Sequence, residues 1–273
     1  MARDLKRSLR VWSGWFGRGV AMGCAELAPG VSGGTVALIT GIYYDILRVP
    51  KLVLSLNWWA LLLQRPYRAL ALMRFGVLLC LLLGMAGALW SLSVLVQWLF
   101  REHPSLILGF FAGLVLAGAL VVARPLDQRH RMLGLPSALL LGLLLYSNPQ
   151  FALPQEPVWI VMAGALGSSA WVLPGISGAL VLLLLGMYEP ALEWVRTLDW
   201  GHLGWLVLGA GLGALLIGRL IGVLWEHHRA PLSGVLVGLM LGSLVRLMPP
   251  EPIGLTTLAL GLLAGWLLGR AGE

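Results

Sequence analysis

The stretches APGVSGGTVALITGIYYDIL (28–47) and LPGISGALVLLLLGMYEPAL (173–192) are two copies of one motif. At a constant offset of 145 positions they share nine identical residues without a gap. The identities pair Pro29 with Pro174, Gly30 with Gly175, Ser32 with Ser177, Gly33 with Gly178, Val36 with Val181, Leu38 with Leu183, Gly41 with Gly186, Tyr43 with Tyr188 and Leu47 with Leu192. Chance is a poor explanation, so we predict a duplicated chain with halves at 1–150 and 151–273.

Each copy lies in a longer apolar stretch, 19–47 or 158–192. A Pro-Gly pair breaks each stretch near its middle, at Pro29-Gly30 and at Pro174-Gly175. Pro removes a backbone donor and disfavours helix in the residue before it, while Gly permits the chain to reverse. The half-segments are too short to cross a bilayer comfortably, because a crossing takes ~20 apolar residues. We therefore predict two re-entrant helical hairpins, each of which enters the membrane and returns to the same side.

The composition identifies the solvent of the chain. Of its 273 residues, 59% are hydrophobic and only 11% are charged, against roughly 25% charged in an average soluble domain. This excludes an ordinary soluble enzyme and predicts an all-α polytopic membrane protein. Cys24 and Cys80 lie in apolar stretches, so the sequence indicates neither a disulfide framework nor a cysteine metal site.

Six further apolar runs have the length of a membrane span, the third of them only just. They are 75–100, 104–123, 132–147, 203–225, 230–248 and 253–269. Each predicted half therefore holds one hairpin and about three spans. A weaker internal echo supports the duplication, since Gly109-x-x-x-Gly113 resembles Gly234-x-x-x-Gly238.

The cations set the predicted orientation. With the N-terminus inside, fifteen of the 19 Lys and Arg residues fall on the inner side and Arg219 falls within a span, while the outer side receives only Arg101, Arg196 and Arg246. The positive-inside rule then makes both termini cytoplasmic. Three crossings follow the first hairpin, so the second hairpin enters from outside and the repeats are inverted, as in many transporters. The net charge of +7 points to anionic membrane lipid as the partner, rather than nucleic acid.

Two other segments are predicted to lie on the inner membrane surface. Residues 1–17 combine basic side chains with Trp and Phe, and residues 51–64 carry Trp58 and Trp59 beside a basic stretch. Both patterns are typical of interfacial helices, whose ordinary role is anchoring.

The paired turns are the candidate binding site. Each places a Gly-rich bend before a half-helix, where unpaired N–H groups and the helix dipole favour an oxyanion. Inverted repeats would bring both starts together near the midplane. The predicted substrate-binding residues are Pro29, Gly30, Ser32, Gly33, Gly34 and Thr35 from the first copy and Pro174, Gly175, Ser177 and Gly178 from the second. The alternative is that the serines merely cap helices and the glycines permit close packing. The presence of two matched copies favours the binding interpretation, because a lone helix cap needs no counterpart in the other half.

Two charged residues in apolar surroundings are further candidates. Arg219 could neutralise a bound phosphate by a bidentate contact, or it could snorkel to the inner surface. Glu26 could form an ion pair or carry a proton in a coupled cycle, unless it lies at a water-filled mouth. Trp171 occupies the position of Glu26 in the second copy.

The sequence does not indicate an enzyme. Ser-Gly occurs three times but is never followed by His, and no nucleophile and base pair is legible. The five histidines have no metal-ligand spacing, so we expect no metal and no cofactor.

At the paired turns the chain resembles a known family. PGVSGGT followed by ALITGIY, and PGISG followed by LLLGMYE, resemble the two signature segments of the bacterial PopT-type undecaprenyl phosphate translocases, and the likeness covers essentially the whole chain. It departs from the pattern at Ala179, where a Ser is expected, which weakens hydroxyl donation in that half. Glu26-Leu27-Ala28 before the first turn also departs, so the resemblance assigns Glu26 no role.

The resemblance implies a multi-pass protein of the bacterial cytoplasmic membrane. Its function would be to return undecaprenyl phosphate, the lipid carrier of envelope polymer synthesis, from the outer to the inner leaflet. The alternative is an anion channel or small-anion transporter, because chloride-channel-type proteins also direct such helix starts at a central ion. The expected partners are the polyprenyl phosphate and membrane phospholipids, with a homodimer left open.

Overall fold

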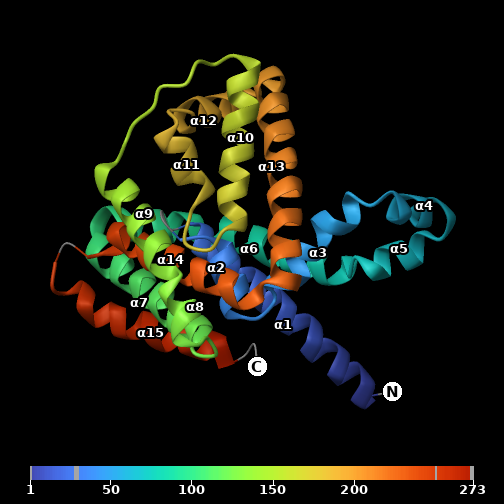
Figure 1. Cartoon of the computed structure of the whole chain (residues 1–273), viewed down its shortest axis with the longest axis horizontal. Helices are drawn as coiled ribbons and strands as arrows, with labels where there is room; N and C mark the ends of the chain where they lie inside the picture. Colours follow the sequence, from blue (N-terminus) through green and yellow to red (C-terminus); the bar gives the residue numbers. More distant parts are fainter. Residues whose placement is uncertain (1, 28–30, 250, 271–273) are drawn as a thin grey trace.

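The computed structural model describes residues 2–27, 31–249 and 251–270, with side chains from Val11 onward. Every regular element in this part is an α-helix, so the predicted all-α polytopic class is confirmed (Figure 1). The helices are α1 (Ala2–Glu26), α2 (Gly33–Ile39), α3 (Tyr43–Val53), α4 (Leu56–Gln64), α5 (Pro66–Leu72), α6 (Phe75–Glu102), α7 (Pro104–Ala123), α8 (Gln128–Met132), α9 (Gly134–Ser147), α10 (Pro157–Val172), α11 (Gly178–Leu184), α12 (Tyr188–Thr197), α13 (Trp200–His227), α14 (Arg229–Leu247) and α15 (Gly254–Arg270).

Four helices are long and apolar enough to cross a membrane, namely α6, α7, α13 and α14. They coincide with four of the six predicted spans. The other two predicted spans are also helices, but α9 has 14 residues and α15 has 17. At ~1.5 Å per residue they reach about 21 and 26 Å, less than the ~30 Å hydrocarbon core.

The first hairpin departs from its predicted outline. Residues 2–26 form one continuous helix, so the separate interfacial helix at 1–17 is a wrong prediction. Nothing breaks the helix, because Pro29 is the first proline in the chain and Gly14 and Gly17 face open space. An isolated Gly lowers helix stability by about 1 kcal/mol without ending the helix.

The return arm of each hairpin is two helices, where the sequence predicts one. α2 and α3 are separated at Gly41 with φ +73°, and α11 and α12 at Gly186 with φ +71°. Gly is favoured there because other residues rarely adopt positive φ. The second break bends the chain by 108° between α11 and α12. The segment 51–64 is also not one helix, because α3 and α4 meet at 84°.

Closely packed glycines join the helices of the central bundle. Gly109 and Gly113 of α7 lie against the backbone of α15, at Gly254 and Leu258. Gly234 and Gly238 of α14 lie in the same way against the segment 130–134, where α9 begins. Small residues spaced by four let membrane helices approach closely. The weaker internal echo of the sequence therefore marks helix contacts.

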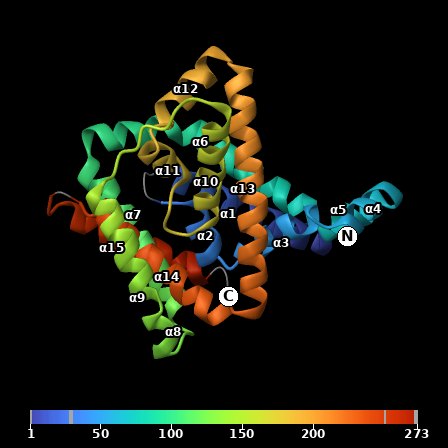
Figure 2. The ribbon, with the colours of Figure 1, turned by 45° about the horizontal axis from the view of Figure 1, so that its top comes forward.

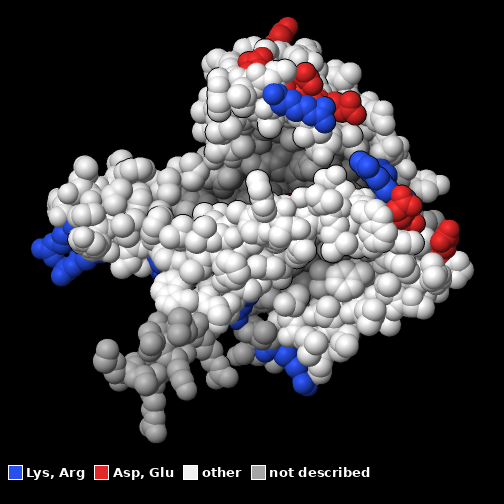
Figure 3. Space-filling view, turned by 180° about the vertical axis from the view of Figure 1, so that it is seen from behind, with Lys and Arg blue, Asp and Glu red and all other residues white. Residues whose placement is uncertain are grey.

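The second hairpin and α13 form a lobe that rises from the rest of the molecule (Figures 1 and 2). Seen from behind, a deep hollow separates this lobe from the body (Figure 3). The first hairpin closes against the lobe, since Pro50 of α3 packs on Gly218 of α13 and Leu47 packs on Gly222. In the described part of the chain α12 has no comparable packing against α6.

Candidate functional site

The start of α2 meets the turn of the second hairpin inside the molecule. The loop at 173–177 lies beside α2 in both ribbon views (Figures 1 and 2). The N–H of Gly175 donates to Thr35 Oγ1 at 3.0 Å, and Thr35 is fully buried. Gly34 lies so close to the end of α10 that a Cβ there would stand 2.9 Å from the Trp171 carbonyl oxygen. The structure thus places Ser32, Gly34 and Thr35 against the end of α10 and the second turn.

Ser32 has two partners, one in each hairpin. Its hydroxyl oxygen accepts from the Gly34 N–H at 3.0 Å, which caps α2. The same hydroxyl donates to the Trp171 carbonyl at 3.1 Å. Tyr43 adds a second bond across the hairpins, from its hydroxyl to the Val172 carbonyl at 2.8 Å. The first hairpin therefore holds the end of α10 by side-chain hydrogen bonds.

Glu26 lies at the start of α2. Its Oε1 atom accepts from the Gly33 N–H at 2.5 Å. Together with the Ser32 cap, the chain's own oxygens satisfy the first two amide groups of this helix. A carboxylate at a helix start is favourable because N–H groups and the dipole both attract negative charge. The position predicted to receive a phosphate oxygen is therefore taken by Glu26 in this conformation.

The start of α11 is different. Ser177 is buried but makes no capping bond with its side chain. Trp171 stands where the first copy has Glu26, so the carboxylate has no counterpart, and Thr35 is matched by Leu180. Within the described residues, the start of α11 thus lacks the side-chain acceptors that occupy the start of α2.

The remaining predicted site residues have mixed outcomes. Pro29 and Gly30 lie outside the described residues. Pro174 and Gly175 are buried in the second turn, and Gly175 has φ +86° and lies against Leu239 of α14. Arg219 lies on an exposed face of α13, makes no hydrogen bond or ion pair with a described residue, and lines none of the cavities below. The structure does not bring Arg219 to the paired turns.

An apolar cavity of about 290 Å³ adjoins the paired turns. Gly34, Tyr43 and Trp171 line the end nearest the turns. Its other walls come from α3, α6 and α13, through Ile46, Leu47, Val49, Pro50, Leu78, Leu81, Leu82, Met85, Ala214, Leu215 and Gly218. Leu82 of α6 is 60% exposed, so the cavity reaches the surface between α6 and α13.

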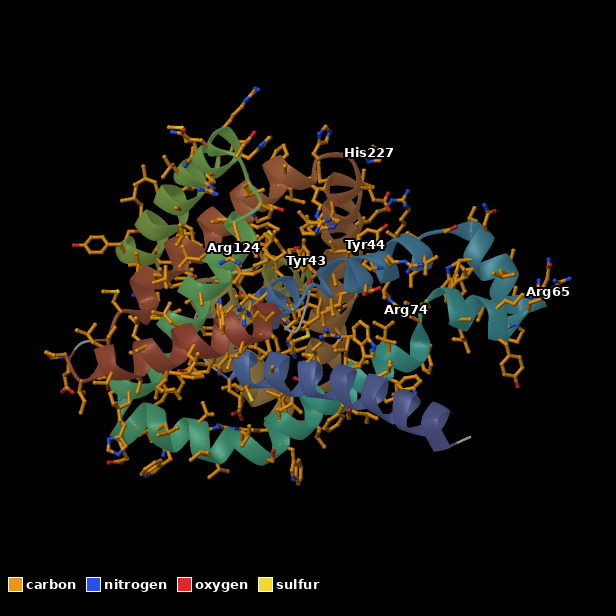
Figure 4. All side chains as sticks on the ribbon, turned by 90° about the horizontal axis from the view of Figure 1, so that it is seen from below. Tyr43, Tyr44, Arg65, Arg74, Arg124 and His227 are labelled. Carbon is orange, nitrogen blue, oxygen red and sulfur yellow. The ribbon has the colours of Figure 1, made fainter. Side chains whose placement is uncertain are left out.

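Sequence reasoning did not find the contacts that close α3 against α13. Lys51 forms an ion pair with Glu226 at 2.7 Å, and the Tyr44 hydroxyl donates to the same carboxylate at 2.6 Å. Tyr43, Tyr44 and Glu226 line a second cavity of about 860 Å³ at this end of the helices, where Figure 4 shows both tyrosines. The repeated Gly-x-Tyr of the motif marks Tyr43 and Tyr188 but not Tyr44, whose counterpart in the second copy is Glu189. The partner in α13 could not be read from the sequence, because 182 positions separate Tyr44 from Glu226.

Fold and site together define a multi-pass membrane protein in which the start of α2 meets the turn of the second hairpin beside an apolar cavity. The chain belongs to the undecaprenyl phosphate translocase-like family, because the family model described as "VCA0040-like: Undecaprenyl phosphate translocase-like" matches residues 22–259. The family predicted from the paired turns is thereby confirmed.

Two curated relatives are both named polyprenyl-phosphate transporter. A polyprenyl-phosphate transporter of Vibrio cholerae serotype O1 is 34% identical over 239 residues, which cover 85% of this chain and 76% of that protein. A polyprenyl-phosphate transporter of Staphylococcus aureus is 28% identical over 281 residues, covering 93% of this chain and 94% of that protein. No solved structure matches the chain significantly.

Proposed function

We propose that this protein carries a polyprenyl phosphate across the bacterial cytoplasmic membrane, from the outer to the cytoplasmic leaflet, with both of its own termini cytoplasmic. The names of the family and of both relatives support a polyprenyl phosphate as substrate. The observation that carries the mechanism is the buried contact of the start of α2 with the end of α10 and the second turn, through Ser32, Thr35 and Gly175.

The headgroup is the costly part of the substrate to move. An isolated ion faces a Born cost of tens of kcal/mol in hydrocarbon. In the proposed site the phosphate lies between the two turns, where Ser32, Thr35 and Ser177 supply hydroxyl groups beside backbone amides. Since Glu26 occupies the start of α2, the phosphate approaches from the side of Ser177. Arg219 is left out of the site because of its position on α13.

The apolar cavity between α6 and α13 suits the prenyl chain. Its lining presents hydrocarbon and aromatic surface next to Gly34. A headgroup at the paired turns can therefore keep its tail in this cavity or in lipid while it moves. A path for small anions would instead need polar walls along its length.

The unequal closure of the hairpins supports an alternating cycle of two inverted repeats. The first hairpin is closed on α13 by Pro50, Leu47 and the Lys51–Glu226 pair. The second hairpin lies beside the hollow between lobe and body (Figure 3). In the proposed cycle, closure of α12 on α6 is coupled to release of α3 from α13, which exposes the turns to the opposite side.

The test is transport by the purified protein in liposomes. A short-chain polyprenyl phosphate is placed in one leaflet and its appearance in the other is measured, with chloride flux in parallel. We expect Ser32→Ala to slow transport at least tenfold and Ser177→Ala to slow it severalfold. Arg219→Gln is the matched control and should transport like the wild type.

Three results would contradict the proposal. Lipid movement equal to that of empty liposomes, together with robust chloride flux, would replace it with the anion channel. Normal transport by both serine variants would remove the paired turns from the site. Loss of transport in Arg219→Gln alone would move the headgroup site to the exposed face of α13.

A further inference from the structure

A groove of about 690 Å³ lies at one end of α7 and α15. Ala117, Leu120 and Val121 of α7 form one wall, and Leu262, Leu263 and Trp266 of α15 form the other. Leu120 is 61% and Leu263 is 52% exposed, so the groove faces the surroundings of the bundle. No residue of either motif copy lines it.

Two arginines border the groove where α7 ends. Arg124 follows the last residue of α7, and Arg131 belongs to α8. Arg131 is held in place, since its Nε donates to the Ala123 carbonyl at 3.1 Å and its Nη2 to the Arg124 carbonyl at 3.2 Å. A third cation is near the opposite wall, where the Arg270 guanidinium lies 3.7 Å from the Trp266 ring centroid.

These cations are not neutralised within the described part of the chain. No ion pair there joins Arg124, Arg131 or Arg270 to a carboxylate. The nearest acid in sequence, Asp127, caps α8 instead, accepting from the His130 N–H at 2.9 Å and contacting the His130 ring at 2.5 Å. The N–H of His130 holds the pKa of the Asp127 carboxyl below its usual value. The acid therefore remains on its own helix, and the groove keeps an excess of positive charge.

We infer that this groove binds an anionic phospholipid of the leaflet on the cation-rich side. The headgroup phosphate lies against the guanidinium groups of Arg124 and Arg131, which suit bidentate contacts to phosphate oxygens. The acyl chains follow the exposed leucines of α7 and α15, and the Trp266 ring stands at the level of the headgroup. Basic pockets between membrane helices recognise anionic headgroups in this way.

Charge complementarity selects this occupant. A zwitterionic lipid would bring a cationic group toward three arginines. The transported polyprenyl phosphate is expected at the paired turns, none of whose residues reach the groove. The inference does not rest on the proposed function, because lipid binding can be measured without transport.

The experiment measures binding of phosphatidylglycerol and phosphatidylcholine to the purified full chain by native mass spectrometry, with thermal stability in parallel. Arg124→Gln removes one cation without touching the Arg131 bonds to α7. Arg65→Gln is the matched control, since Arg65 is exposed at the far end of the arm formed by α4 and α5, distant from Arg124 (Figure 4). Leu263→Trp fills the groove without changing charge.

We expect phosphatidylglycerol to bind at least tenfold more tightly than phosphatidylcholine. Arg124→Gln and Leu263→Trp should each weaken that binding severalfold, while Arg65→Gln leaves it unchanged. Equal binding of the two lipids, or equal losses in Arg124→Gln and Arg65→Gln, would overturn the inference. Displacement of phosphatidylglycerol by equimolar polyprenyl phosphate would overturn it too, and would make the groove part of the substrate path.

Discussion

The two hairpins carry the same motif but differ in their packing. Leu38 is 6% exposed and its counterpart Leu183 is 50% exposed. Tyr43 and Leu47 are buried at 3% and 2%, whereas Tyr188 and Leu192 are exposed at 36% and 41%. Since these paired residues are identical in type, the motif itself cannot cause the difference. Its cause lies in the surfaces that the hairpins meet.

The facing helices supply that cause. α13 offers Gly218 and Gly222 to α3, so that Pro50 and Leu47 can approach its backbone. The offset of 125 positions that relates Gly109 to Gly234 places Ser93 and Gln97 of α6 at the same points. Larger side chains keep a neighbouring helix at a greater distance. Hairpins that share the motif thus close to different degrees because their receiving helices differ.

We expect the largest effect from a substitution that prevents α3 from packing against α13. Gly218→Leu places a side chain against Pro50, whose Cγ would lie 2.6 Å from the new Cβ. Overpacking of this kind costs ~1–3 kcal/mol, which is enough to shift a two-state closure by ~5- to 150-fold. We expect a faster reaction of Ser233→Cys, in the cavity beneath α3, with a membrane-impermeant maleimide in a background without Cys24 and Cys80.

Gly211→Leu is the control for that substitution. Gly211 lies on the same helix, and a Cβ added there would meet nothing within 4 Å, so the labelling rate should stay at the wild-type value. If Gly218→Leu left the maleimide reaction of Ser233→Cys unchanged, α3 would not be the element that closes this cavity.

The next effect separates the two helix starts. Glu26→Ala leaves the Gly33 N–H without its carboxylate partner, and a hydrogen bond to a charged group contributes ~1.5–3 kcal/mol. We expect the midpoint of thermal unfolding to fall by about 5 °C. Glu26→Gln should recover part of the loss because an amide oxygen still accepts. Glu193→Ala on the exposed face of α12 should lose less than about 1 °C, and a fall equal to that of Glu26→Ala would contradict the special role of the α2 start.

A smaller effect distinguishes the two motif tyrosines. Tyr43→Phe removes the buried hydrogen bond to Val172, which is worth about 1 kcal/mol and ~2–4 °C. Tyr188→Phe removes a hydroxyl that has no partner among the described residues, so its unfolding midpoint should be unchanged. Equal midpoints for both variants would show that the closure of the first hairpin does not depend on Tyr43.

The smallest effect concerns the start of α13. The Asp199 carboxylate accepts hydrogen bonds from the N–H groups of Gly201 and His202 and also contacts the His202 ring. These contacts lower the pKa of the Asp199 carboxyl, and the ring contact has the largest effect. A lowered pKa adds stability above the ordinary value near 3.8, and the gain is lost as the pH falls through the folded-state pKa. Asp199→Ala should therefore lower the midpoint by about 2 °C at pH 7.

That difference should narrow progressively as the pH falls below the ordinary value near 3.8 and the Asp199 carboxyl takes up a proton. Ser55→Ala serves as the comparison, because Ser55 begins α4 without a side-chain capping bond. A gap between Asp199→Ala and the wild type that stays constant as the pH is lowered from 7 through the whole acid range would assign the effect to packing instead of charge.

Local sequence patterns located most of the helices. The apolar runs found α6, α7, α13 and α14 because a membrane span is one uninterrupted segment whose backbone bonds are all internal. The positive φ at Gly41 and Gly186 was missed because the return arms look apolar throughout and a single Gly rarely ends a helix. The first hairpin's true beginning was missed because basic residues suggested a separate surface helix, although nothing in 2–26 interrupts α1.

The candidate site was predictable only in part. The paired identities pointed to Ser32 and Ser177, and Thr35 was found as a further hydroxyl in the first copy, since hydroxyls at Gly-rich turns stand out in an apolar chain. Glu26 at the start of α2 and the uncapped start of α11 depend on contacts across a turn, which spacing does not reveal. The sequence left two positions open for Arg219, because a cation in an apolar run can face either the bundle or its surroundings, and the structure places it on the exposed face of α13.

By itself, the sequence determined the membrane environment, the helical class, the family and the paired turns, because composition and repeated motifs are local properties of the chain. The tertiary structure decided which hairpin is closed, which helix start is already occupied and which residues face the cavities. The closure of the hairpin depends on residues more than a hundred positions apart, such as Tyr43 and Val172 or Lys51 and Glu226, and the occupied helix start depends on Glu26 reaching Gly33 across a turn. Such contacts exist only after the helices have packed.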